Sequence, residues 1–174
     1  MTWTAFHRRG EVLRQVVETA DQRVDGELPL YVEGVSETFA DAIDLLGALQ
    51  LRWHTRLAGR IERELASQPM NLEQAVVTAW HRTVDEMPGV RAVLDQQRAH
   101  PHDEAMARTT ATAAAKEHVL LAVMAGRGGP ADPESVRVGE QIEERARATY
   151  VPARRGDERD EHPILHWLKS ALAA

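Results

Sequence analysis

The chain has 174 residues, a net charge of −6 and no cysteine. A chain of this length predicts one domain, which buries about 70% of its unfolded surface and needs no covalent cross-links. The absence of cysteine excludes disulfides, thiol nucleophiles and thiolate-bound metals. The excess of acidic residues argues against nucleic acid as a partner, because a binder would need a strongly separated basic face.

Composition also guides the interpretation of the basic and apolar residues. The basic residues are 19 arginines and 2 lysines, a ratio that usually reflects genome composition, so no single arginine is taken as a dedicated anion clamp. The chain has no run of about 18 apolar residues, and no apolar segment follows its N-terminal arginines. We therefore expect a soluble cytoplasmic protein that does not enter a membrane.

Apolar residues recur at helical spacing near the N-terminus, which predicts a first helix. They are Phe6, Gly10, Leu13, Val17, Ala20 and Val24. Asp25 and Gly26 are expected to end this helix, because glycine readily adopts the left-handed cap conformation. Residues 26–35 then form a connection, whose proline and glycine argue against a strand.

A long helix is predicted over residues 37–67, with Ser36 as its N-cap. Its length would be about 46 Å at about 1.5 Å per residue. Its apolar stripe consists of Ile43, Leu46, Leu49, Trp53, Leu57, Ile61 and Leu65. We expect one continuous rod that buries Trp53 and exposes its opposite face to water.

Local signals bound the remaining helices. Asn71 with Gln74 resembles a capping box, and Asp103 is a good N-cap. Pro88 and Gly89 interrupt the pattern, so the next segment is a shorter helix or a kinked continuation. Helices are predicted over 72–86, 90–98, 104–125 and 133–149. The fold class is therefore all-α, an irregular helical bundle of about five to seven helices around the long second helix.

The C-terminal part differs in composition from the rest. Residues 1–150 are predicted to form a single helical-bundle domain, and residues 151–162 a charged linker. Residues 163–174 have the pattern of a short amphipathic helix. Such a helix is too short to be stable alone, so we expect it to dock on the body of the protein or on a partner.

Four arginines of the long helix fall within about 80° of one another on a helical wheel, opposite Trp53. They are Arg52, Arg56, Arg60 and Arg63. One interpretation is an ordinary solvated face, neutralised by Glu62 and Glu64. The other is a basic ridge that binds an acidic partner or a nucleic-acid backbone.

His54 is unusual because the same wheel places it in the apolar half, close to Ile61 and beside Gln50. A buried imidazole needs partners, since an unsatisfied buried polar group costs on the order of 1–3 kcal/mol. His54 is therefore either a core histidine bonded to a carbonyl or to Gln50, or a metal ligand or proton carrier.

Two groups of residues are candidate metal ligands. His54 with Glu117 and His118 would supply nitrogen and oxygen ligands for zinc, iron or manganese inside a bundle. His162 and His166 stand at the i, i+4 spacing of a metal-binding helix, although the proline after the first disfavours helix there. The chain lacks the Glu-x-x-His spacing of diiron bundles, so no cofactor is predicted and a divalent metal remains the alternative.

The chain contains no phosphate-binding loop, no dinucleotide fingerprint, no His-Glu-x-x-His and no nucleophile elbow. We therefore interpret it as a helical module without catalytic activity, which has an interaction or regulatory role through a protein partner or self-association. The alternative is a metal- or small-ligand-binding helical bundle centred on His54. His81 is predicted to be solvated, because it projects away from the apolar face of its helix.

Overall fold

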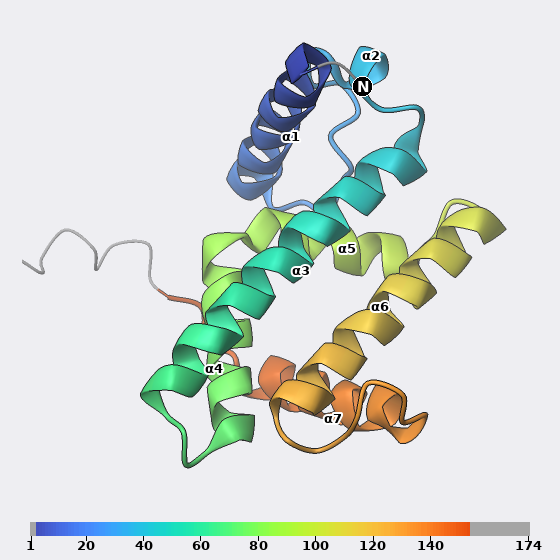
Figure 1. Cartoon of the computed structure of the whole chain (residues 1–174). Coiled ribbons are helices and arrows are strands. Elements are labelled where there is room, and N and C mark those ends of the chain that lie inside the picture. Colours follow the sequence, from blue (N-terminus) through green and yellow to red (C-terminus); the bar gives the residue numbers. More distant parts are fainter. Residues whose placement is uncertain (1–2, 154–174) are drawn as a thin grey trace, which may run out of the picture.

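A computed structural model describes residues 3–153, with side chains from His7 onward, and this part of the chain forms a bundle of seven helices without strands (Figure 1). The helices are α1 (Trp3–Arg23), α2 (Val35–Thr38), α3 (Ala42–Ser67), α4 (Leu72–Glu86), α5 (Pro88–Ala99), α6 (Glu104–Met124) and α7 (Glu134–Thr149). The all-α bundle predicted from the sequence is confirmed, and its long helix is α3. None of the described helices is both long and apolar enough to cross a membrane.

The start of the long helix differs from the prediction. α3 begins at Ala42, and Asp41 caps it by accepting a hydrogen bond from the Asp44 amide at 2.8 Å. Ser36, the predicted cap, lies inside the short helix α2. The chain turns between the two helices at Phe39, whose backbone is extended and whose side chain is buried. Burial of Phe39 therefore separates the two segments that the sequence pattern joined.

From Ala42 onward α3 is the continuous rod that the sequence predicted. Its buried side chains are those of Leu45, Leu46, Leu49, Trp53, Leu57, Ile61 and Glu64. Trp53 is only 1% exposed, and its ring meets that of Trp80 on α4 edge to face, with 6.4 Å between the ring centroids. This pair ties α3 to α4 at the centre of the core.

Helix α1 buries Val12, Val16 and Ala20, while the predicted Leu13 and Val17 are half-buried at the edge of the contact. The contact with α5 sets this rotation. A Cβ at Gly89 of α5 would overlap the carbonyl group of Ala20, so the two backbones cross in direct contact.

The same crossing caps α5. Its N-terminus has no side-chain cap from the preceding residue, and the carboxylate of Asp21 on α1 supplies one. Asp21 accepts hydrogen bonds from the amides of Gly89 at 2.8 Å and Val90 at 3.2 Å. A negative charge at this position also interacts favourably with the helix dipole. The segment after Pro88 is therefore a helix of its own, fixed by α1.

Helices α6 and α7 cross at Gly139, where a Cβ would overlap the carbonyl of His118. The figure shows α7 beneath the C-terminal end of α6, while α5 passes behind the space that separates α6 from α3 (Figure 1). This arrangement leaves one side of α3 and one side of α6 facing each other across α5.

Candidate functional site

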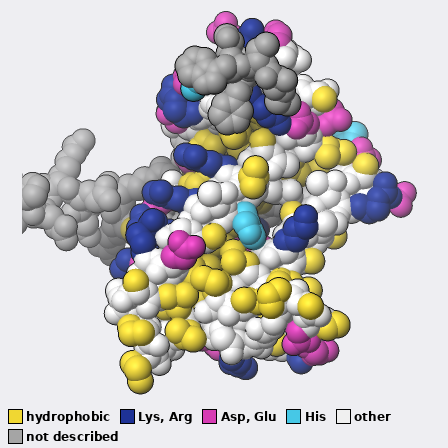
Figure 2. All heavy atoms as spheres, in the orientation of Figure 1, with side chains coloured by type: hydrophobic (Ala, Val, Ile, Leu, Met, Phe, Trp, Pro, Cys, Tyr) yellow, Lys and Arg dark blue, Asp and Glu magenta, His cyan; other side chains and the backbone are white. Residues whose placement is uncertain are grey.

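An open groove of about 1140 Å³ lies between α3 and α6. Its lining is mostly apolar, and α5 contributes its floor through Arg91 and Leu94. Figure 2 shows that this face is hollowed between the two helices, with basic side chains gathered along the outer side of α3. Leu51 lines the groove and is 68% exposed, so a large apolar side chain stands in solvent at its edge.

The width of the groove follows from the side chains of α6. The run Ala113, Ala114 and Ala115 lines its wall, and none of these side chains is long enough to reach α3. Gly47 stands on the opposite wall. Small residues on both walls leave a space that larger side chains would have filled.

Buried charged side chains lie at the floor of the groove. Arg91 is 6% exposed and donates hydrogen bonds to Glu117 of α6 at 3.2 Å and to Asp95 of its own helix. Its guanidinium also lies over the Trp53 ring, 4.9 Å from the centroid. Burial opposes the charge of Arg91, but the surrounding carboxylates outweigh that effect and raise its pKa.

The ion pairs continue into α7 through Glu143, which is 2% exposed. His118 donates to Glu143 at 2.7 Å, and Arg98 and Arg147 donate to it at 3.2 and 2.7 Å. Burial alone would raise the pKa of Glu143. The hydrogen bond from His118 and the nearby guanidinium charges outweigh that effect and hold the pKa well below its usual range.

Three guanidinium groups and three carboxylates therefore balance one another beneath the groove. They belong to Arg91, Arg98, Arg147, Asp95, Glu117 and Glu143. A buried charge that keeps its partners is stable, whereas removing one partner leaves an uncompensated charge. The network fixes the relative positions of α5, α6 and α7, and thereby the shape of the groove.

His54 lines the groove and is half-buried. It lies in the apolar half of α3, as the sequence predicted, but it forms no hydrogen bond with any residue from 7 to 153. Of the two alternatives for His54, the bond to Gln50 or to a carbonyl is not formed within the described residues, and both side chains line the groove. His54 therefore presents to the groove an imidazole that has no hydrogen bond to a described residue.

The predicted metal ligands are divided between different partners. Glu117 is bound to Arg91, and His118 to Glu143 on the other side of α6. Within the described part of the chain, no group of three or more metal-binding side chains is assembled. His162 and His166 lie outside the described residues, so the metal site stays a prediction.

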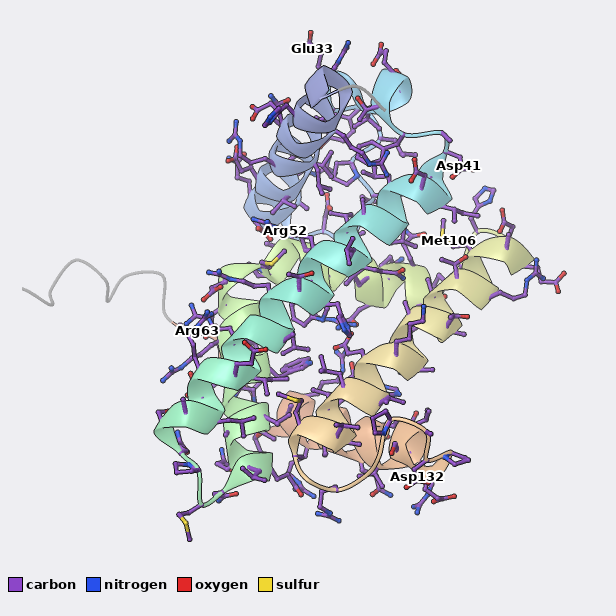
Figure 3. The ribbon with its side chains drawn as sticks, in the orientation of Figure 1. Glu33, Asp41, Arg52, Arg63, Met106 and Asp132 are labelled. Carbon is purple, nitrogen blue, oxygen red and sulfur yellow. The ribbon has the colours of Figure 1, made fainter. Side chains whose placement is uncertain are left out.

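The arginines of α3 lie on the side away from the groove, as Figure 3 shows for Arg52 and Arg63. The partners expected for them were wrong. Arg56 and Arg60 both pair with Glu86 of α4, because that helix packs alongside. Glu64, predicted as a partner, is buried and bound instead to an arginine of α4. Arg52 and Arg63 form no ion pair with a described residue.

His81, predicted to be solvated, is half-buried. Its Nε2 donates to the carbonyl of Ala146 at 2.7 Å, and its ring packs beside Trp80 and Tyr150. Tyr150 in turn donates to Asp85 at 2.8 Å, and burial together with this bond raises the pKa of Tyr150 to about 12. This cluster holds the end of α7 against α4.

Most of the buried charges were not predicted from the sequence. Two of the missed pairs had a local signal, since Arg91 with Asp95 and Glu143 with Arg147 stand four residues apart on one helix. That spacing is equally common on exposed faces, so it did not show that these pairs are buried.

The fold and the groove together define a class: an all-α bundle with an open, largely apolar groove over a buried ion-pair network. Comparison of the chain with protein-family models, with curated proteins and with solved structures found no match.

Proposed function

We propose that the protein is an interaction module that binds one amphipathic helix of a protein partner in the groove between α3 and α6. The observation that carries the proposal is the open, mostly apolar groove of about 1140 Å³ between two helices. Helix-in-groove recognition uses this geometry, with the apolar face of the bound helix covered by the walls.

The size of the groove favours a helix over a small molecule. Small-molecule sites are clefts or cavities of about 300–1000 Å³ that bury most of their ligand, whereas this groove lies near the upper end of that range and is open, with Leu51 at its edge mostly exposed. The alanine wall of α6 lets a neighbouring backbone approach closely. A helix has a diameter of about 10–12 Å with its side chains, so it fits only where the walls carry small side chains.

Charge defines the partner further. Of the charged side chains that line the groove, Arg91, Arg98, Arg108 and Glu117 are each paired with a carboxylate or guanidinium of the described residues, so the charge still available there is that of Lys116. Lys116 is exposed and forms no ion pair with a described residue. The favoured partner is therefore a helix with an apolar face and acidic flanks, since unlike charges across an interface favour both encounter and specificity.

The test uses synthetic amphipathic peptides of about 18 residues, which is about five helical turns. One carries a Leu/Ala face with Glu flanks, and the other has Lys in place of Glu. We expect the acidic peptide to bind with a Kd on the order of 10 μM and the basic peptide about tenfold more weakly, by fluorescence anisotropy at low salt.

The substitution Ala114→Glu places a charged side chain on the groove wall, and Ala111→Glu makes the same change on an exposed face of the same helix. We expect the first to weaken peptide binding at least about tenfold and the second to leave it unchanged. Equal binding by both variants would place the peptide elsewhere and end the proposal.

The imidazole of His54, which has no hydrogen bond to a described residue, supports a second candidate, a small ligand or divalent metal bound in the same groove. Elemental analysis after purification without a nickel column, with added zinc, iron and manganese, tests it. Metal at one per chain in the native protein, lost in His54→Ala, would support this function. A metal content far below one per chain would exclude the metal-binding candidate.

A further inference from the structure

We propose that the groove is occupied in the same molecule by residues 163–172, and that the acidic stretch 157–161 crosses the arginines of α3 to bring them there. This inference rests on the proposed function of the groove. It makes the protein a self-covered module, whose partner helix must displace a segment of the chain itself.

The point where the chain leaves the described residues lies beside the arginines. The amide of Ala153 donates a hydrogen bond to Asp85 near the end of α4, at 3.3 Å. The next residue, Glu86, pairs with Arg56 and Arg60. Residues that follow Ala153 therefore start next to the basic side of α3.

The charges on the two sides match. Arg154 and Arg155 come first after Ala153, and the acidic stretch lies beyond them: residues 157–161, "DERDE", carry four carboxylates and one guanidinium. Arg52 and Arg63 have no ion-pair partner among the described residues. Burial and the neighbouring guanidinium groups of Arg63 and Arg56 lower the pKa of Arg60, which indicates that positive charge exceeds negative charge here. An acidic segment laid on this surface would relieve that excess.

The chain is long enough to cross α3. The arginines and the groove lie on opposite sides of this helix (Figure 3), which is about 10–12 Å across. Residues 154–162 span at most about 30 Å when extended. The segment that follows therefore reaches the groove without any movement of the bundle.

The segment that arrives there has the chemistry that the groove favours. On a helical wheel the apolar side chains from 164 to 172 fall within about 160°. They are Ile164, Leu165, Trp167, Leu168, Ala171 and Leu172. His166, Lys169 and Ser170 fall on the opposite side. One apolar face preceded by an acidic flank is the partner deduced above from the lining of the groove.

Covalent attachment makes such a contact effective even where the isolated segment binds weakly. A short tether holds its segment at an effective concentration on the order of millimolar. A segment with a Kd on the order of 100 μM would then occupy the groove about nine-tenths of the time and weaken binding of a free helix about tenfold.

Because the chain has no cysteine, disulfide trapping in the full-length protein tests the placement directly. The double variant Ala114→Cys with Leu168→Cys puts one thiol in the groove and one on the segment. The control, Ala111→Cys with Leu168→Cys, moves the first thiol to the exposed side of α6. We expect the first pair to form a disulfide within one molecule at least about tenfold faster than the control under mild oxidation.

Equal rates for the two pairs would overturn the inference, and so would a product of dimer mass, which would assign the groove to a second copy. The contribution of charge is tested in the same assay by replacing Asp157, Glu158, Asp160 and Glu161 with their amides. We expect this variant to cross-link several-fold more slowly at low salt and to lose most of the salt dependence.

Peptide binding distinguishes this inference from the proposed function of the groove as a helix-binding site. The variant Ile164→Glu with Leu168→Glu should bind the acidic probe peptide about tenfold more tightly than the native chain. If both bind equally while Ala114→Glu abolishes binding, the groove is a helix site but its own segment does not cover it. If Ala114→Glu has no effect, both proposals fail.

Discussion

Because α6 and α7 cross in direct contact at Gly139, we expect even an alanine at this position to lower the stability of the protein strongly. A Cβ added at Gly139 would overlap the carbonyl of His118 and lie 2.6 Å from the His118 Cα. Carbon atoms in contact are about 3.5–4.0 Å apart, and the added Cβ would lie 2.3 Å from the His118 carbonyl carbon, so Gly139→Ala must push the helices apart by more than about 1 Å. This movement also stretches the 2.7 Å hydrogen bond between His118 and Glu143, which lies at the same crossing.

The magnitude follows from three contributions. Overpacking costs about 1–3 kcal/mol, and a buried polar pair pulled apart costs about 1–3 kcal/mol more. Alanine recovers about 0.5–1 kcal/mol over glycine within a helix. We therefore expect Gly139→Ala to lower the free energy of unfolding by about 3 kcal/mol, and the Tm by about 6–12 °C for a chain of this size.

Gly10→Ala is the matched control, because Gly10 is exposed inside α1 and no atom lies within 4 Å of its added Cβ. The same chemical change should there raise the stability by about 0.5–1 kcal/mol. Urea unfolding followed by circular dichroism measures both variants. If Gly139→Ala unfolds at the same urea concentration as Gly10→Ala, the close crossing of α6 and α7 is refuted.

Two further predictions concern pH. The lowered pKa of Glu143 means that its charge stabilises the fold above pH 4.5, the ordinary pKa of a glutamate, and that this stability is lost as pH falls below that value. Glu143→Gln should therefore be markedly less stable than the native protein at pH 7, with a smaller difference at pH 3. The control Glu140→Gln, at an exposed position, should stay close to native at both pH values. The raised pKa of Tyr150 predicts a tyrosine absorbance change near pH 12 in the folded protein. This change should be absent in Tyr150→Phe and shifted to lower pH in Asp85→Asn. A native titration curve identical to that of Tyr150→Phe would contradict the hydrogen bond between Tyr150 and Asp85.

The helix boundaries that were predicted well depend on local chemistry. Asn71 and Asp103 cap α4 and α6 as expected, by accepting hydrogen bonds from amides three residues ahead. Such bonds form within one turn and need no tertiary contact. The start of α3 was missed because Ser36 and Asp41 are both good caps by type. The choice between them depended on the burial of Phe39, which is a tertiary effect.

The candidate site was predicted only in part, and for a related reason. His54 was singled out because its position on the apolar half of α3 is a property of that helix alone. Its missing hydrogen bond was not predictable, since it depends on the distance between α3 and α6. In the same way Glu86, rather than Glu62, pairs with Arg56 and Arg60 of α3, because α4 lies alongside.

The amino-acid sequence by itself determined that this protein is helical, where most helices begin and end, and that α3 buries Trp53, because each of these depends on residues within about one turn of one another. Only the tertiary structure decided that a groove opens over α5 and that Arg91, Glu117 and Glu143 share one charge network beneath it. These three residues come from three helices, and their distances are set by how the backbones cross at glycines. No local pattern carries that information.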